Sequence, residues 1–579
     1  MWKKVTAVVL CLIFAALLLS SCGKSSKSFA LPLEKPATSC DPQIADGNGL
    51  RSIANNTFEG LVRLDRDGRP IPGAASSWTI SGGGTIYTFH LRQGQKWHLT
   101  DGMEDILGKS YKKTFSTAVT ADDFVFGLQR AVASSTDSPM AASLFCILNA
   151  EAIHAGATPS ALGVRSLGPY TVQIQLEWPN ANFLAALASA PAMPCNRSFF
   201  HATAGRYCLD GDLALCNGPY YVSSINSTTG GVLLKKNPDY QGEYPALADS
   251  LSFVYADDLG GVGSGSSTEP EQQESTNGDP VPVDILTSIQ SESGLSAGVV
   301  DADEVTNLPR KYKTTSYENQ VKLLCFNQKS KLAKNGSLRM ALACATDVTA
   351  IREIDSRAPS GIIPAGSMTT AGKNYRRSAG YVVLGKPDLN KAKKYFAGIK
   401  ALQDSEEENK GTVYGDTPDT LNITLICLAN DRGAAQSLVQ NWQKIFGTTL
   451  SVTVKTYPNQ LKLNSALEKG KYDIAYTSYR TDDAYAVNFL DTFTGTSSAN
   501  FIGLNDPAYN ALVAKARTAS MDGSIAACCK EAERYLIQKG YIIPIRQESS
   551  SLVSNKGAKD IFADPAGAVL SAFILEEEK

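Results

Sequence analysis

The feature that constrains this chain most is one strongly apolar run near its N-terminus. Residues 5–19 are apolar except for Thr6, and Lys3 and Lys4 precede them. The run is shorter than the roughly 20 residues that span a bilayer, but a short apolar core after positive charges is typical of a secretory signal. No later stretch is comparably apolar. The sequence therefore predicts an exported chain whose body folds in water.

A cysteine follows this run after two small residues, in Leu19-Ser20-Ser21-Cys22. The arrangement is similar to a bacterial lipobox, in which the cysteine is acylated and becomes the new N-terminus. The alternative is an ordinary signal peptide followed by a chance cysteine. The next residues are polar and typical of a flexible linker. We therefore predict a lipoprotein signal peptide over residues 1–21, a lipid such as palmitate on Cys22, and a tether over residues 22–29.

Composition excludes several classes of function. The chain carries 55 Lys and Arg against 57 Asp and Glu, a net charge of -2, which argues against a nucleic-acid partner. Only four histidines occur, with no Cys/His metal spacing, so no metal and no cofactor are expected. Export permits disulfides, and Cys195, Cys208 and Cys216 are close enough in sequence for one pair among them. Their connectivity stays open.

Strand and helix patterns alternate along the body. Residues 85–91 and 171–176 alternate polar and apolar side chains, as half-buried strands do. Thr120 and Asp123 form a variant capping box for a helix that continues to Val132. Residues 260–280 are rich in Gly, Ser, Glu and Gln, and we expect a disordered surface insertion there. The mixture indicates an α/β protein with more than one lobe.

Several short segments, taken together, resemble the solute-binding proteins of peptide ABC importers, the oligopeptide- and dipeptide-binding family. Their order and spacing over about 500 residues are more specific than any single motif. They are NTFEGLVR (56–63), GAASSW (73–78), YTFHLRQGQKW (87–97), TADDF (120–124), SP (138–139), NGPY (217–220), LRMALA (338–343), IIP (362–364) and YDIA (472–475). The loop between Gly102 and Thr120 is longer than the family usually has.

This resemblance implies a periplasmic-binding-protein-like clamp of two lobes with an additional third domain, joined by hinge crossovers. By analogy, lobe I comprises residues 30–70, 196–310 and 546–579. The extra domain comprises residues 71–195, and lobe II residues 311–545. Members capture a ligand in the cleft and deliver it to a membrane permease driven by separate ATPases. A monomer, held at the extracellular face of a single-membrane bacterium, is expected here.

The resemblance also implies binding residues. In the family an Asp three residues after an aromatic residue anchors the ligand's amine, which assigns Asp482 after Tyr479; Asp483 competes for that role. A carboxylate enclosed between lobes pairs well with an ammonium group. Ser478 and Arg480 flank the aromatic residue. Phe58 and Glu59 are expected to face the cleft from the other lobe, although a structural role fits Glu59 equally well. Tyr479 replaces the family's usual Trp, and the acidic-Pro pair after the anchor is missing.

Other functions fit the sequence less well. A relative with this fold could bind a metal chelate or a sugar, or sense a signalling peptide. A cell-surface hydrolase would need catalytic motifs, and no Gly-x-Ser-x-Gly elbow occurs. Ser21-Cys22-Gly23-Lys24 matches Ser-x-x-Lys, but cleavage before Cys22 would destroy it. We therefore expect a binding protein and no enzyme.

Overall fold

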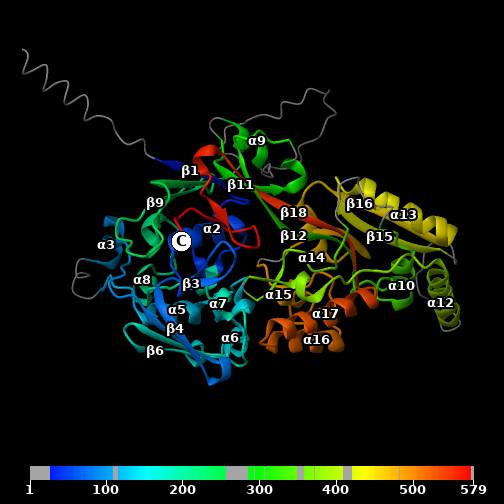
Figure 1. Ribbon diagram of the computed structural model, residues 1–579, viewed down its shortest axis with the longest axis horizontal. Helices are drawn as coiled ribbons and strands as arrows, with labels where there is room; N and C mark the ends of the chain where they lie inside the picture. Colours follow the sequence, from blue (N-terminus) through cyan, green and yellow to red (C-terminus); the bar gives the residue numbers. More distant parts are fainter. Residues whose placement is uncertain are drawn as a thin grey trace, which may run out of the picture.

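The computed structural model places the chain in two bodies connected by long strands (Figure 1). No helix among its residues is long and apolar enough to cross a bilayer. The structure describes residues 27–108, 115–255, 284–291, 294–305, 307–348, 358–370, 372–407, 420–480, 483–497 and 499–575. The predicted signal peptide, Cys22 and the insertion over 260–280 lie outside these residues.

A four-stranded sheet forms the frame of lobe I. Its order is β1, β10, β9, β8, with bounds Ser28–Pro32, Ser250–Val254, Val232–Lys236 and Tyr220–Ile225. Helix α2 (Asn48–Thr57) lies beside it. The predicted tether is too long, because Ser28 and Phe29 already belong to β1. Phe29 is buried and is paired in register with Leu251 of β10.

The extra domain contains an antiparallel sheet in the order β4, β5, β7, β6. Its strands are Ala75–Ser81, Ile86–Leu91, Thr171–Gln175 and Val164–Gly168. The two strands predicted from alternation are therefore confirmed. Helix α5 (Ala121–Val132) begins with the predicted capping box of Thr120 and Asp123. This domain shares one continuous hydrophobic core with lobe I, in which Phe89, Phe124 and Phe253 are all buried.

A six-stranded mixed sheet extends from lobe I into lobe II and forms the frame of lobe II. Its order is β11, β18, β12, β17, β15, β16, with bounds Ala297–Asp301, Ile542–Ser554, Lys313–Phe326, Ile474–Tyr479, Leu421–Leu428 and Leu450–Tyr457. Both faces are covered. Leu323 and Cys325 of β12 join one core and Leu324 and Phe326 the other, because successive side chains point to opposite faces. This is why β12 ends in a continuous apolar run.

Helices cover the two faces of this sheet. One face packs against α10 (Gly336–Ala345), α12 (Leu389–Glu407) and α13 (Arg432–Phe446). The other packs against α11 (Tyr375–Ala379), α14 (Gln460–Lys469), α15 (Ala486–Asp491), α16 (Pro507–Thr518) and α17 (Asp522–Gln538).

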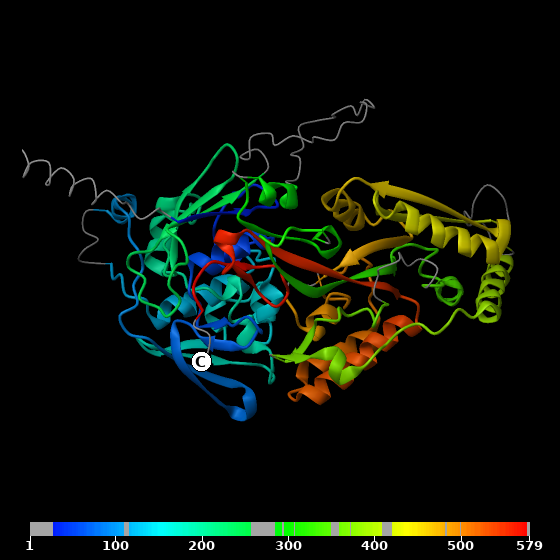
Figure 2. The same cartoon turned by 45° about the horizontal axis from the view of Figure 1, so that its top comes forward.

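Strands β12 and β18 run from lobe I into lobe II, as Figure 2 shows from a second direction. Their register shifts between Tyr317 and Gln320 and again between Lys322 and Leu323. Such irregularities bend a strand locally. The exact lobe boundaries stay predictions, and β18 itself runs across the expected boundary at 545/546.

The ten cysteines that the structure describes are free thiols. The disulfide considered possible among Cys195, Cys208 and Cys216 is therefore not present, although all three are buried. Burial raises the pKa of Cys195 and of Cys216 to about 12. Buried, protonated thiols of this kind react slowly.

Candidate functional site

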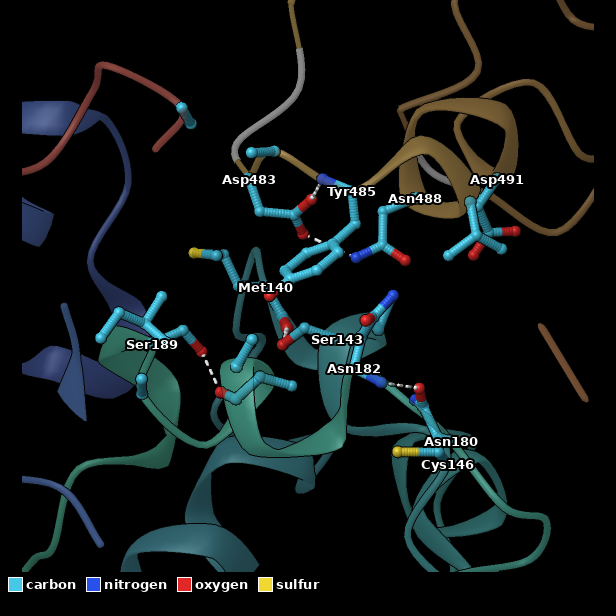
Figure 3. Close-up of a pocket in the computed structure, with 18 of the residues that line it drawn as sticks. Met140, Ser143, Cys146, Asn180, Asn182, Ser189, Asp483, Tyr485, Asn488 and Asp491 are labelled. Carbon is cyan, nitrogen blue, oxygen red and sulfur yellow. Dashed lines mark hydrogen bonds between the residues drawn. The ribbon is translucent and has the colours of Figure 1, made fainter. Parts of the chain in front are cut away.

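A cavity of about 340 Å³ lies where lobe I, the extra domain and lobe II meet. Its walls include Arg51 from α2, Asn182 from the extra domain, and Tyr485 and Asn488 at the start of α15. Figure 3 shows Tyr485 facing Met140 and Asn182 across this space. A ligand here would touch all three parts of the chain at once.

A larger cavity of about 880 Å³ lies over β11, β12 and β18, and the two cavities meet at Pro565. Its lining is rich in carboxylates, including Asp301, Glu304 and Glu548. Partial removal from water, helped by the negative charge of Glu548, raises the pKa of Asp301. Glu548 is neutralised locally, because Arg546 donates to it at 2.6 Å and 2.9 Å.

The predicted residues Ser478 and Tyr479 end strand β17. This strand pairs with β12 through Tyr479, but its pairing with β15 stops at Tyr476. The hydroxyl of Ser478 donates to Glu548 at 2.5 Å. Ser478 also lies opposite Lys322, whose ammonium group contacts Asp431 at 2.9 Å. Ser478 thus belongs to a charged network at the point where the lobes join.

Tyr479 is half-buried in an aromatic cluster. Its ring centroid lies 5.4 Å from that of Phe489 and 5.6 Å from that of Phe493. Its hydroxyl donates to Thr492 Oγ1 at 3.0 Å. The structure therefore fixes the orientation of this ring from within lobe II.

The predicted amine anchor, Asp482, lies outside the described residues. The carboxylate of its neighbour Asp483 accepts hydrogen bonds from the backbone N–H of Tyr485 at 2.8 Å and from the Asn488 side chain at 2.6 Å (Figure 3). Asp483 therefore supports the first turn of α15. The assignment of the amine anchor to Asp482 stays a prediction.

Arg480 is close enough to two carboxylates for its charge to act on them. Its positive charge favours ionisation of Asp301 and of Asp564, although burial dominates and the pKa of each is raised. Asp301 lines the larger cavity and Asp564 the smaller one. Arg480 therefore lies near both cavities.

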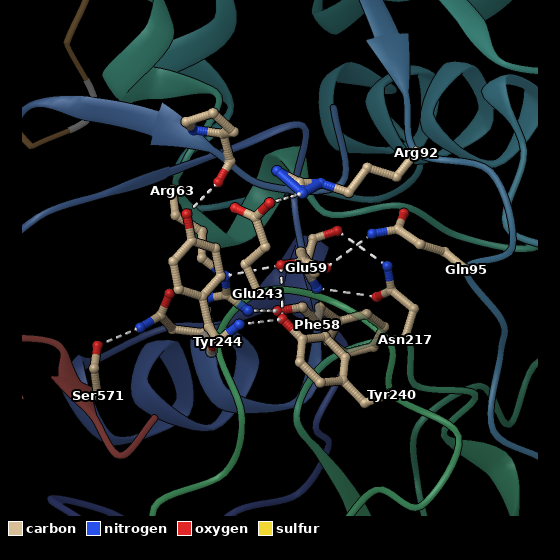
Figure 4. A network of polar contacts seen from close by, with 12 residues as sticks. Phe58, Glu59, Arg63, Arg92, Gln95, Asn217, Tyr240, Glu243, Tyr244 and Ser571 are labelled. Atoms are coloured by element: carbon tan, nitrogen blue, oxygen red, sulfur yellow. Dashed lines mark hydrogen bonds and ion pairs between the residues drawn. The ribbon is translucent and has the colours of Figure 1, made fainter. Parts of the chain in front are cut away.

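Phe58 and Glu59 lie inside lobe I and line neither cavity, since both are 0% exposed. Glu59 accepts hydrogen bonds from Arg63 at 3.3 Å, Gln95 at 3.1 Å and Tyr240 at 2.9 Å (Figure 4). Arg63 itself lines the smaller cavity. The position of Glu59 thus corresponds to the structural role considered for it, in which it holds Arg63 beside the cleft.

Most of the cavity-lining residues were not singled out as binding residues from the sequence, and Ser138, Asn182 and Tyr485 are three of them. Ser138 was noted only as part of a family segment. No local pattern marks the other two, because their shared surroundings arise from contacts between distant segments. Among the described residues no group of His, Cys, Asp or Glu side chains could hold a metal ion.

The arrangement of sheets and crossing strands is that of a two-lobed α/β binding-protein clamp with a third domain. A model of the bacterial extracellular solute-binding proteins, family 5, matches residues 69–501. That match covers most of the chain, so the chain belongs to this family of extracellular solute-binding proteins.

Relatives of known name are similar to this chain in sequence over nearly its whole length. The dipeptide-binding protein DppE of Bacillus subtilis is 23% identical over 542 residues, which cover 93% of this chain and 89% of DppE. The periplasmic oligopeptide-binding protein OppA of Escherichia coli is 24% identical over 519 residues, 88% and 84% of the two chains. The structure of Listeria monocytogenes OppA bound to peptide has a TM-score of 0.67 at 20% identity, covering 96% of this chain and all of that chain. This structural likeness shows the shared fold.

Proposed function

We propose that this chain is the lipid-anchored substrate-binding subunit of an ABC importer, which captures extracellular oligopeptides and delivers them to a membrane permease. The observation that carries the proposal is the cavity lined jointly by both lobes and the extra domain. A ligand that contacts both lobes favours the closed state over the open one. The relatives named for dipeptide and oligopeptide binding support peptide as the ligand class.

A receptor for many peptides must hold what all peptides share, which is the backbone and the terminal ammonium group. Strand β17 continues past the end of its pairing with β15 and leads directly to Asp482. In this proposal Asp482 binds the ammonium group, while Ser478, Tyr479 and Arg480 shape the surrounding surface. No catalytic step is required of any of these residues.

Calorimetry with free and N-acetylated forms of the same peptide tests the proposal. Acetylation of the ligand, or Asp482→Asn, should each weaken binding by about 2–5 kcal/mol, since either leaves a buried charge unpaired. Glu531→Gln is the matched control, because Glu531 is an exposed carboxylate on α17 that contacts Lys515.

Equal affinity for free and acetylated peptides would rule out the amine anchor. Binding of no peptide at all would reject the ligand class. In that case the metal chelates and sugars bound by other proteins of this fold become the next ligands to assay. Binding of a signalling peptide alone would instead indicate a sensor, and turnover of a peptide would point to a hydrolase.

A further inference from the structure

The smaller cavity is partly open and has the size of a small-molecule pocket. Its volume of about 340 Å³ is at the low end of the roughly 300–1,000 Å³ of small-molecule pockets. It equals the space of roughly ten water molecules at about 30 Å³ each. The cavity therefore has room for an amino-acid side chain.

Several polar atoms in its wall, including His154 Nδ1, are buried without a hydrogen-bond partner in the described part of the chain. Three of them are oxygens: Ser138 Oγ, Asn182 Oδ1 and the phenolic oxygen of Tyr485. Their residues are 6%, 8% and 4% exposed. Buried polar atoms are nearly always paired in folded proteins, because an unpaired one loses its hydration with nothing in return. A polar group that entered the cavity would supply the missing bonds.

The bonding capacity of these atoms defines that group. The side-chain N–H of Asn182 already donates to the Thr369 carbonyl at 3.1 Å, so its Oδ1 remains as an acceptor. The hydroxyls of Ser138 and Tyr485 can each donate. The three atoms together therefore match a partner with an N–H donor and an oxygen acceptor, as in a carboxamide.

Some charged groups on the wall have partners of opposite charge. Asp491 pairs with Arg517, and Arg63 pairs with Glu59 at 3.3 Å. Arg51 and Asp564 also line the cavity, and the charge of Arg51 acts on Asp564. An ionic ligand group that lay only beside such paired charges would lose its hydration without gaining a counter-charge, which disfavours it relative to an uncharged polar group.

We infer that this cavity is a side-chain subsite that selects a carboxamide, so that peptides with Gln at one position bind better than their apolar counterparts. The inference deepens the function proposed above and rests on it. The apolar part of the wall, which includes Met140 and Val487, would pack against the methylene groups of the same side chain.

Calorimetry with short alanine peptides tests this subsite in the wild-type protein. Gln and Met are compared at each position in turn, because Met has similar length and lacks the amide. At one position Gln should bind about tenfold more tightly than Met, as expected for a few satisfied hydrogen bonds. Equal binding of the two at every position, with the parent alanine peptide still bound, would overturn the subsite alone. Failure of every peptide to bind would overturn the proposed function as well.

Two variants then assign the preference to the cavity. Tyr485→Phe and Ser138→Ala each remove one hydroxyl, and we expect each to reduce the Gln preference several-fold. Tyr472→Phe is the matched control: Tyr472 is also 4% exposed, but its hydroxyl donates to the Phe501 carbonyl at 3.0 Å, outside the cavity. A preference that survives both variants, or that Tyr472→Phe also removes, would overturn the assignment. If one variant fails to fold, the other variant and the wild-type comparison still test whether the cavity causes the Gln preference.

Discussion

Asp123 is a buried carboxylate whose surroundings make folding sensitive to pH. It is 4% exposed at the start of α5. Its oxygens accept hydrogen bonds from the Thr120 N–H at 2.8 Å, the Asn196 side chain at 3.0 Å and the Trp97 indole at 3.4 Å. Burial outweighs these bonds and raises its pKa to about 6.

A raised carboxyl pKa stabilises the folded state at low pH, where the folded chain holds a proton that the unfolded chain releases. Between about pH 4 and pH 6 this group should therefore remove up to about 3 kcal/mol of stability as pH rises. Chemical denaturation across this pH range measures the effect as the difference in the free energy of unfolding between wild type and Asp123→Asn. Asp122→Asn, at the exposed neighbour, is the control. A difference that is flat or grows in favour of wild type with rising pH would contradict the prediction.

At the scale of elements, a buried ion pair joins α11 and α17 to the segment that leads into the cleft. Glu533 of α17 is fully buried and accepts from Arg376 at 2.5 Å and 2.8 Å and from the Tyr375 hydroxyl at 2.8 Å. The backbone of Ile363 bonds to both partners, donating to Glu533 and accepting from Arg376. The pair thereby fixes the segment just before Met368, which lines the cavity.

Removing one partner of the Arg376–Glu533 pair should lower the free energy of unfolding far more than removing both. Arg376→Met leaves the Glu533 carboxylate buried and uncompensated, which typically costs about 3–5 kcal/mol. The double variant Arg376→Met/Glu533→Leu should recover much of that loss. Urea unfolding followed by circular dichroism checks both. Lys515→Met breaks an exposed pair and should leave the unfolding midpoint nearly unchanged; an equal shift in Lys515→Met and Arg376→Met would show that burial is not the cause.

These elements also show what sequence can and cannot predict. The capping box at Thr120 and the alternating strands are local patterns, so they were predictable. The burial of Glu59 was not, because its partners Gln95 and Tyr240 come from distant segments. For the same reason the three unpaired oxygens of the cavity could not be grouped from sequence. The family resemblance named Ser478 and Tyr479, and the structure shows that they end strand β17.

For the whole molecule, two strands carry the connection between the lobes. β12 and β18 pair along most of their length and contribute to the cores of both bodies, with Leu552 in the first and Ile543 in the second. The register shift between Tyr317 and Gln320 lies between the residues of β12 that contact the two cores, whereas the shift at Leu323 lies within the core of lobe II. Bending between Tyr317 and Gln320 would change the width of the cleft while both cores stay intact, which is the property that a hinge requires.

The proposed lipid on Cys22 would hold the molecule at a defined distance from the membrane. Strand β1 begins at Ser28, so a lipid on Cys22 would leave at most about 20 Å of extended chain at ~3.6 Å per residue. Lobe I would then lie close to the membrane. We expect Cys22→Ala to move the protein from the membrane fraction to the medium while the peptide affinity of the purified protein is unchanged, since Cys22 precedes every described core residue. Cys11→Ala, within the apolar run, is the matched control and should stay with the membrane. Retention of Cys22→Ala in the membrane fraction would place the anchor elsewhere.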